Sequence, residues 1–293
     1  MNQQCFINVL HHQVLEDWGE SNCVESSVTL FEKKESNAPL SIKLVIKGAE
    51  RYKVSDSYYK LDQGEFIIIG QGQQIETTVK SKEPTNGVCI YPPISMIQDV
   101  FNGFGKPLEK QLTQEFNNES VYLTTSKYRL LSPIATSKFL NQYIPMLLNQ
   151  SEKDDNWWHA FYLKLAEHLA YDQQEIKLIL GQLEVAKKHT KEELYRRISK
   201  TRDYIHDHKF ESIDLQELAQ LSSLSKYHFL RSFKAIYKQS PYQYILNLKL
   251  KEAKKLLQQD YTYQEIANEI GYSDAKNLRK KLRSYLTFYK HSG

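Results

Sequence analysis

The sequence predicts an α+β fold, with a small β-barrel and helices in the N-terminal two-thirds and an all-helical domain in the last third. Three observations predict it. Residues 25–92 are rich in Val, Ile and Tyr and are interrupted by Gly-containing turns, as strands are. From residue 93 onward, apolar residues recur at helical spacing. Charge also divides the chain, because residues 1–186 are acidic and residues 187–293 are basic.

The charge division predicts two domains, residues 1–186 and residues 187–293. The first carries 17 Lys and Arg against 23 Asp and Glu, whereas the second carries 22 against 12. A basic domain indicates a polyanionic partner, although a Lys-rich helical face that is merely solvated explains the charge equally well. The composition, 41% hydrophobic and 25% charged, is that of a soluble globular protein.

Cysteine usage and the chain's N-terminal residues indicate a cellular compartment. Cys5, Cys23 and Cys89 have no CxxC spacing, which is typical of a reducing cytoplasm. The N-terminal residues lack the basic and apolar regions of a signal peptide, and no apolar run is long enough to span a bilayer. We therefore expect a cytoplasmic, nucleoid-associated protein without a membrane partner.

The predicted strands are the segments "VESSVTLFE", "LSIKLVIKGAERYKV", "YYKLDQGEFIIIGQGQQIETTVK" and "GVCIYPP". Short strands with closely spaced turns favour a small sandwich or barrel. The segment "LDQGEFIIIGQGQQI" resembles the strand-turn-strand of cupin barrels. Candidates for lining its interior are Tyr52, Tyr58, Tyr59, Phe66 and Tyr91, although core packing explains them as well.

Metal ligands are missing from the position where metal-binding cupins place two His and a Glu. Gln73 and Gln74 stand near that position, and no His occurs between His12 and His159. We therefore expect no metal, no cofactor and no cupin enzyme. The barrel is interpreted as a module for sensing or for pairing.

Helices are predicted at residues 94–104, at 132–150 with Pro133 near the start, and at 156–186. Trp157 and Trp158 anchor a subunit contact or pack within their own domain, and both interpretations stay open. The polar segment "KKHTKEEL" is predicted to connect the two domains. Three histidines, His189, His206 and His208, lack ligand partners at metal-site spacing and are expected to face solvent.

The basic domain contains the pattern of a helix-turn-helix. In "IDLQELAQLSSLS", Asp214 is an N-cap with Glu217 three residues later, a capping-box pattern. In "SKYHFLRSFKAIYKQSP", Ser225 is a second N-cap. Phe229 and Phe233 are spaced i, i+4 and should both face inward. A short helix, a short turn and a second helix make the motif.

The same layout recurs about 48 residues later. "QELA" at residues 216–219 returns as "QEIA" at residues 264–267, and the Phe pair returns as Leu278 and Leu282. Gly271 lies in the second turn, where a positive φ is often needed. The repeat predicts two helix-turn-helix units joined by the helix "PYQYILNLKLKEAKKLLQQD".

These segments, together with "LKLKEAKKLL" and "YQEIANEIGYSD", resemble the AraC/XylS family of bacterial transcription regulators over roughly residues 194–289. The resemblance implies two helix-turn-helix subdomains on a rigid linker helix, entering successive major grooves on one face of DNA. It also implies a cupin-like N-terminal domain for effector binding or dimerisation. The second unit departs from the family, because it has a Leu pair instead of a Phe pair, lacks the Gly-x-x-Pro stop, and leaves no room for a full final helix.

The resemblance implies base-reading and phosphate-contacting positions. The base-reading positions are Tyr227, Leu230, Arg231, Lys276, Asn277 and Lys280. The phosphate-contacting positions are Ser225, Lys234, Arg279 and Arg283. Surface packing on a neighbouring helix is the alternative for Tyr227 and Leu230. The segment "KNLRKKLR" carries five cations, so we expect the second unit to grip phosphates and the first to read bases more sharply.

We therefore expect a sequence-specific DNA-binding transcription regulator whose N-terminal domain senses an effector, dimerises or does both. The expected partners are double-stranded promoter DNA, a small-molecule effector, a second copy of the chain and, for an activator, RNA polymerase. Two alternatives are a regulator that acts mainly through protein contacts with weak DNA reading, and a cupin-type enzyme. The sequence has no Ser-His-Asp or phosphate-loop constellation and no cysteine cluster for DNA repair, so an enzyme is not expected.

Overall fold

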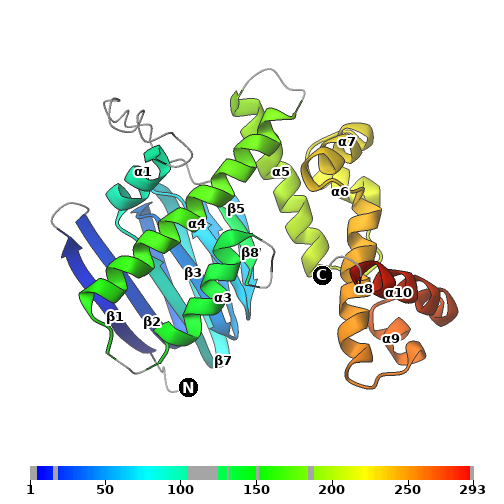
Figure 1. Ribbon diagram of the computed structural model, residues 1–293, viewed down its shortest axis with the longest axis horizontal. Helices are drawn as coiled ribbons and strands as arrows, with labels where there is room; N and C mark the ends of the chain where they lie inside the picture. Colours follow the sequence, from blue (N-terminus) through cyan, green and yellow to red (C-terminus); the bar gives the residue numbers. More distant parts are fainter. Residues whose placement is uncertain are drawn as a thin grey trace. The chain divides into compact units, whose positions relative to one another are not determined.

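The computed structural model describes residues 5–15, 19–103, 125–130, 132, 134–149, 152–183 and 188–290. The chain forms two compact units, Met1–Lys177 and Leu178–Gly293 (Figure 1). The predicted boundary between residues 186 and 187 falls among residues outside the described ranges. The first unit joins a sheet to helices and the second is helical, which confirms the α+β fold class.

The first unit is built on an eight-stranded antiparallel sheet with the order β1-β2-β7-β3-β6-β8, to which β4 and β5 are attached through β7. Its strands are β1 (Cys5–Leu15), β2 (Gly19–Ala38), β3 (Ser41–Lys47), β4 (Ala49–Val54), β5 (Ser57–Asp62), β6 (Glu65–Ile69), β7 (Gln73–Tyr91) and β8 (Ser126–Arg129). The prediction that strands begin at residue 25 was wrong, because β1 and the start of β2 precede it.

The long strands β2 and β7 bend the sheet around an interior. One half of β7 pairs with β3 at residues 86–90, and the other half pairs with β4 at residues 75–78. Register shifts interrupt the β2–β7 ladder between Val28 and Leu30 and again between Glu35 and Ala38. Such bulges add twist and bend a strand, so one pair of strands serves both halves of the sheet.

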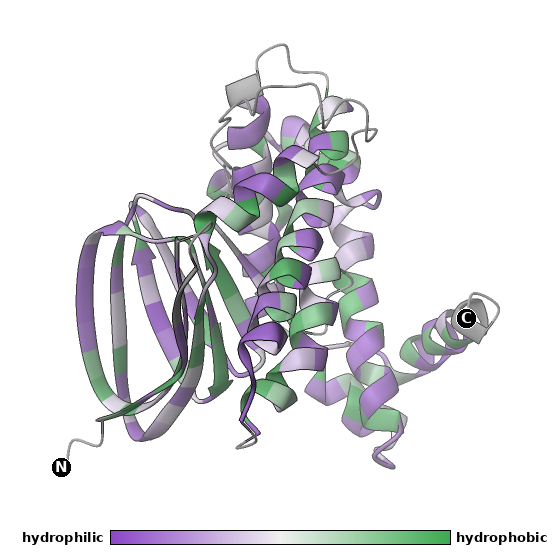
Figure 2. Cartoon of the chain, turned by 60° about the vertical axis from the view of Figure 1, so that its left-hand side comes forward, coloured by the Kyte–Doolittle hydropathy of each residue, from purple (hydrophilic) through white to green (hydrophobic). Residues whose placement is uncertain are grey.

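Hydrophobic residues recur along the strands (Figure 2), and those of β2, β3, β6 and β7 divide between two separate cores. In β6, Phe66 and Ile68 pack under the helices, whereas Ile67 and Ile69 pack in the interior of the curved sheet. Among the predicted interior aromatics, Tyr52 and Tyr91 do line an interior cavity. Phe66 instead packs under the helices, Tyr59 is half-buried beside the interior core, and Tyr58 is exposed.

Three helices of the first unit are described: α1 (Ile94–Gly103), α3 (Ala135–Leu147) and α4 (Asp155–Gly181). Trp158 is buried and its ring stacks on His11 of β1, with 4.3 Å between centroids. Trp157 stacks on Phe161. Both tryptophans therefore pack within their own unit. The helix predicted at residues 132–150 is α3, which spans Ala135–Leu147, while Pro133 lies outside the described residues, and α4 ends at Gly181 rather than at residue 186.

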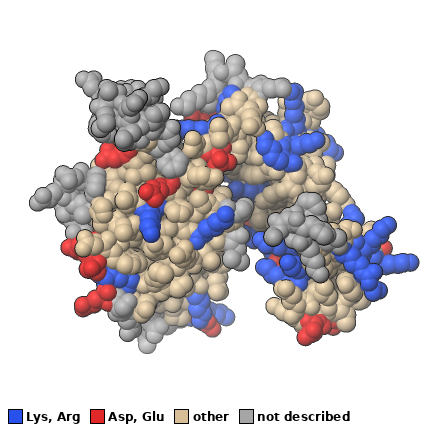
Figure 3. Space-filling model, viewed as in Figure 1, with Lys and Arg blue, Asp and Glu red and all other residues tan. Residues whose placement is uncertain are grey.

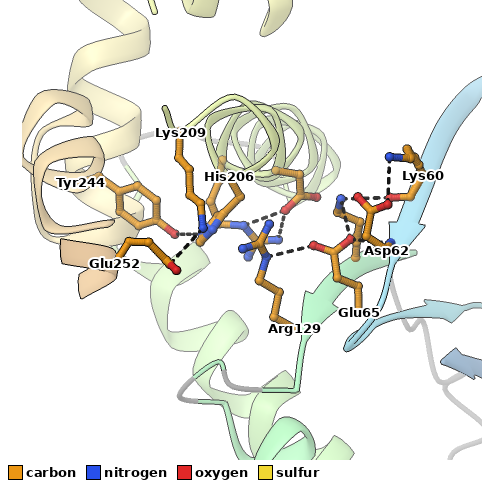
Figure 4. Close-up of polar contacts among 11 residues, drawn as sticks. Lys60, Asp62, Glu65, Arg129, His206, Lys209, Tyr244 and Glu252 are labelled. Carbon is orange, nitrogen blue, oxygen red and sulfur yellow. Dashed lines mark hydrogen bonds and ion pairs between the residues drawn. The ribbon is translucent and has the colours of Figure 1, made fainter. Parts of the chain in front are cut away.

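A buried ion pair attaches β8 to the sheet. Lys127 Nζ lies 3.2 Å from Glu65 Oε2, and both side chains are about 95% buried. The guanidinium of Arg129 lies 2.9 Å from the other oxygen of Glu65 (Figure 4). The attraction of Glu65 to two cations offsets the free-energy cost of removing these charges from water. The cluster therefore fixes the register between β6 and β8.

The second unit consists of α5 (Lys188–Asp207), α6 (Leu215–Leu221), α7 (Lys226–Tyr237), α8 (Pro241–Leu257), α9 (Tyr263–Glu269) and α10 (Ala275–Lys290). The predicted connecting segment is largely helical, because α5 already begins at Lys188. His206 and His208 are half-buried against Tyr244 and Tyr204, not solvent-facing as expected. The side chain of His189 lies outside the described residues.

Candidate DNA-binding interface

The first helix-turn-helix is α6–α7, and its turn is closed by side-chain and backbone hydrogen bonds. Asp214 caps α6 by accepting from Gln216 N at 3.1 Å. The expected capping box is incomplete, because Glu217 accepts a hydrogen bond from the Tyr204 hydroxyl. Leu224 N donates to Ala219 O across the turn, at 3.0 Å. Ser225 then caps α7 by accepting from His228 N at 3.3 Å.

Two phenylalanines form the buried side of α7. Phe229 and Phe233 are fully buried, and their rings meet edge to face at 5.6 Å. Tyr227, Arg231 and Lys234 are therefore exposed on the other side, with Tyr227 69% exposed. The sequence correctly predicted which side of α7 faces inward.

The second helix-turn-helix, α9–α10, has the better-formed cap. The Thr262 hydroxyl accepts from Glu265 N at 3.3 Å, and Glu265 accepts from Thr262 N at 2.8 Å. This is a complete capping box, and the signature T-x-x-E at residues 262–265 could have predicted it. Leu278 and Leu282 are fully buried, as the repeat predicted.

Gly271 in the second turn has φ +62°, as expected for that position. An ideal Cβ on Gly271 would lie 2.2 Å from the carbonyl oxygen of Phe210. Any side chain here would therefore clash with backbone that precedes α6. The turn between α9 and α10 thus lies directly against the backbone that leads into α6.

The outward side of α10 is basic (Figure 3). Its exposed residues include Lys276, Asn277, Arg279, Lys280 and Arg283, and the helix continues to Lys290. Asn277 and Lys280 also line a hollow of about 490 Å³ between α8 and α10. The guanidinium of Arg279 lies 5.4 Å from the centre of the Tyr263 ring. This cation–π contact helps to attach α10 to α9.

Polar contacts join α8 to the α5 segment and to the turn between α9 and α10. His206 bonds the Tyr244 hydroxyl at 2.7 Å, and Lys209 pairs with Glu252 at 3.2 Å (Figure 4). Lys249 Nζ donates to Gly271 O at 3.2 Å, and burial lowers the pKa of that lysine. Its aliphatic stem packs inside while its amine satisfies the turn. The helix α8 is therefore attached to the α5 segment at one point and to the turn between α9 and α10 at another.

The first unit of the chain contains the second candidate site, a cavity of about 510 Å³ enclosed by the curved sheet. Its size is that of a small-molecule site. No three His, Cys, Asp or Glu side chains within the described ranges gather closely enough to hold a metal ion. Among the described helices, none is both long and apolar enough to cross a membrane.

Comparisons with known proteins match the helical unit. Residues 218–287 match the family model described as a helix-turn-helix domain. The HTH-type transcriptional regulator YbfI of Bacillus subtilis (strain 168) is 33% identical over 76 residues, 26% of this chain and 28% of that protein. The MmsAB operon regulatory protein of Pseudomonas aeruginosa PAO1 is 34% identical over 73 residues, 25% of this chain and 24% of that protein. The matched region thus spans about a quarter of these relatives.

Longer matches are more distant. The HTH-type transcriptional regulator YdeC of Bacillus subtilis (strain 168) is 19% identical over 248 residues, 82% of this chain and 78% of that protein. Among solved structures, ToxT from Vibrio cholerae O395 aligns with 90% of this chain and 92% of its own, at 10% identity and a TM-score of 0.33. The family model matches residues 218–287, from within α6 to within α10, and the C-terminal unit therefore contains a helix-turn-helix domain.

Proposed function

We propose that the protein is a transcription regulator that binds double-stranded promoter DNA through α7 and α10 and binds a small-molecule effector in its N-terminal unit. The observation that carries the proposal concerns α7 and α10, the second helix of each helix-turn-helix. Each buries an apolar i, i+4 pair and exposes a basic side. A helix exposed in this way can enter a major groove, where Arg pairs with a guanine edge.

The two exposed sides support different tasks. In α7, Arg231 stands beside the exposed Tyr227 and the half-buried Leu230, which offers one guanine contact and an apolar surface for thymine methyl groups. In α10, lysines and arginines dominate, and these contact phosphates as charges. The N-cap role of Ser225 leaves its hydroxyl hydrogen able to donate to a phosphate.

Further partners follow from this role. A regulator of promoters acts on the nucleoid in the cytoplasm, and an activator also contacts RNA polymerase. A second copy of the chain is the proposed partner of β1, whose Phe6, Ile7 and Val9 side chains are more than half exposed at an edge of the sheet. The proposed role requires no chemical step by the protein.

The test is selection of bound DNA from a random double-stranded library with the purified full chain. Arg231→Ala and Lys280→Ala are selected in parallel, and Lys80→Ala, an exposed lysine of β7, is the control for loss of one charge. We expect one motif for the wild type and for the control. The Arg231 variant should lose information at one base position, at a cost of about 1–3 kcal/mol in binding.

The outcomes distinguish the candidate functions. Loss of affinity without loss of preference in the Lys280 variant assigns α10 to phosphate contact. Absence of any enriched motif for the wild type at modest salt would contradict the proposal and favour a regulator that acts through protein contacts.

A further inference from the structure

The cavity of the first unit contains polar side chains that the alternation of the strands directs inward. Lys43 of β3 is opposite Cys89 of β7 in the register, so both face the interior. Glu50 and Tyr52 of β4 face it as well, two residues apart. A lysine and a glutamate inside the sheet are uncommon, because both are almost never fully buried without a partner.

Lys43 is a buried cation whose polar contacts among the described residues are a hydroxyl and a thiol. Its side chain is 6% exposed, and its Nζ lies 3.1 Å from the Tyr91 hydroxyl and 3.9 Å from the Cys89 sulfur. No carboxylate of the described residues lies within ion-pair distance of it. A buried ammonium normally has a paired anion, since desolvation is otherwise uncompensated.

The groups around Lys43 keep their protons at neutral pH. Burial raises the pKa of the Cys89 thiol and of the Tyr91 hydroxyl, so both are neutral there. Burial disfavours the charged form of Lys43, whereas the hydrogen bond to Tyr91 and the charge of Glu35 favour it, and the pKa of Lys43 is raised. The amine is therefore a cation and a poor nucleophile, which favours an ionic ligand over an imine-forming one.

Glu50 does not neutralise this cation by contact. Its carboxyl accepts a hydrogen bond from the Tyr52 hydroxyl, and burial raises its pKa. Gly87 makes room for it, because an ideal Cβ there would lie 2.8 Å from Glu50 Oε1. Glu50 is thus held at one wall of the cavity, while the ammonium of Lys43 remains available to a ligand.

The rest of the lining combines an apolar wall with polar residues that include Glu20, Lys33 and Glu35, of which Lys33 and Glu35 pair with each other. Val24, Val28, Leu40, Val79 and Ile94 contribute to the wall. A ligand that fits has one anionic group and a hydrocarbon body, because each part then meets its own kind of surface. We propose that the cavity binds a small organic carboxylate, with its carboxylate on Lys43 and Tyr91 and its hydrocarbon body on the apolar wall.

This inference rests on the proposed sensing role of the first unit, but its test measures binding without DNA. Isothermal titration calorimetry on the full chain at pH 7 uses butanoate, hexanoate and octanoate, each beside its primary amide. We expect the acids to bind at least about tenfold more tightly than the amides, since a charge-assisted contact is lost in the amide. Affinity should rise about fourfold for each added CH₂.

Three variants assign the effect. Lys43→Met should remove the preference for acid over amide while the increase with chain length remains. Lys34→Met is the matched control, because Lys34 does not line the cavity and its side chain is 79% exposed, and it should keep the preference. Tyr91→Phe preserves the ring and should weaken acid binding severalfold and amide binding less, because the hydroxyl bonds a charged acceptor more strongly, which keeps the test valid even where the Lys43 variant fails to fold.

Two outcomes would overturn the inference: equal affinity for acid and amide, or no binding by any acid at about 10 mM, well above the millimolar range of a weak site. Either result leaves the DNA-selection test intact. Conversely, carboxylate binding by a chain that selects no DNA motif would contradict the proposed regulator role alone.

Discussion

The two helix-turn-helix units share one plan and differ in what they bury and expose. The first buries two phenylalanines and exposes one arginine with a tyrosine, whereas the second buries two leucines and exposes a run of cations. The second unit also has the complete capping box and an unbroken α10. The second helix-turn-helix is therefore a well-formed unit, and its proposed task is to contact phosphates.

The largest expected effect is at the turn of the second unit. Gly271→Ala should lower the free energy of unfolding by about 3 kcal/mol or more, because the new Cβ would meet Phe210 O in addition to the strain at positive φ. Gly64→Ala is the control, since Gly64 has φ +77° but nothing within 4 Å of an added Cβ, and it should cost only about 1–2 kcal/mol.

Urea unfolding measures both variants. Equal costs for Gly271→Ala and Gly64→Ala would contradict the close approach between the second turn and the backbone preceding α6.

Exchanging the core residues of the two helix-turn-helix motifs tests whether each core has the volume that its own side chains fill. Leu282→Phe should cost about 1–3 kcal/mol, because it overfills a core in which the leucine is already fully buried. Phe233→Leu should cost a similar amount by leaving a cavity. Thermal unfolding checks both. Stabilisation by Leu282→Phe would show that the second core is underfilled and that the unit is a degraded copy.

Salt dependence separates the two exposed sides. Lys280→Ala should reduce the slope of log affinity against log salt by about one, since one fewer phosphate is neutralised. Arg231→Ala should change the slope less and the base preference more. Fluorescence anisotropy with a selected duplex, measured at several salt concentrations, gives both slopes. Identical slopes and identical preferences in the two variants would remove the distinction between the units.

Loss of a cap is a smaller effect. Thr262→Ala should cost about 1 kcal/mol, because the hydroxyl is the only acceptor in the cap that Glu265 N uses. Asp214→Ala removes a single bond from α6 and should cost less, since its box is incomplete. Chemical denaturation compares the two variants, and a larger loss at Asp214 would reverse the inferred order of the caps.

The smallest effect is a change in pH dependence at α5. Hydrogen bonds from Arg196 and Arg197 lower the pKa of Glu193 from 4.5 to about 2. A carboxyl with a lowered folded-state pKa stabilises the protein above its unfolded pKa, and that contribution is lost as pH falls from about 4.5 to about 2. Glu193→Gln should flatten the stability profile in this window, whereas Glu192→Gln should leave it steep. A profile unchanged by Glu193→Gln would contradict the ion pair.

Much of the helical unit could be predicted because its signals are local. The i, i+4 pairs of α7 and α10, the cap at Ser225 and the glycine at residue 271 all depend on residues within one or two turns. The capping box at Thr262 also depends on neighbouring residues alone, but it was not predicted. The roles of the exposed residues on DNA remain predictions.

The sheet was harder because its partners are distant in sequence. Strand β1 contains two histidines and pairs only with the strand that follows it, so its pattern is weak before the partner is known. Lys43 stands among apolar residues in "LSIKLVIK", and alternation alone would place it on a solvated face. Curvature created by β2 and β7 makes that face an interior, and no local signal reports it.

Hydroxyl-radical footprinting on a selected duplex tests the central claim most directly, that both helix-turn-helix units contact DNA together. The account predicts two protected segments on one face of the duplex, about one helical turn or 10 bp apart. Arg231→Ala should weaken protection of one segment and Lys280→Ala that of the other, while Lys80→Ala changes neither. A single protected segment in the wild type, lost in the Arg231 variant and unaffected by the Lys280 variant, would contradict the account.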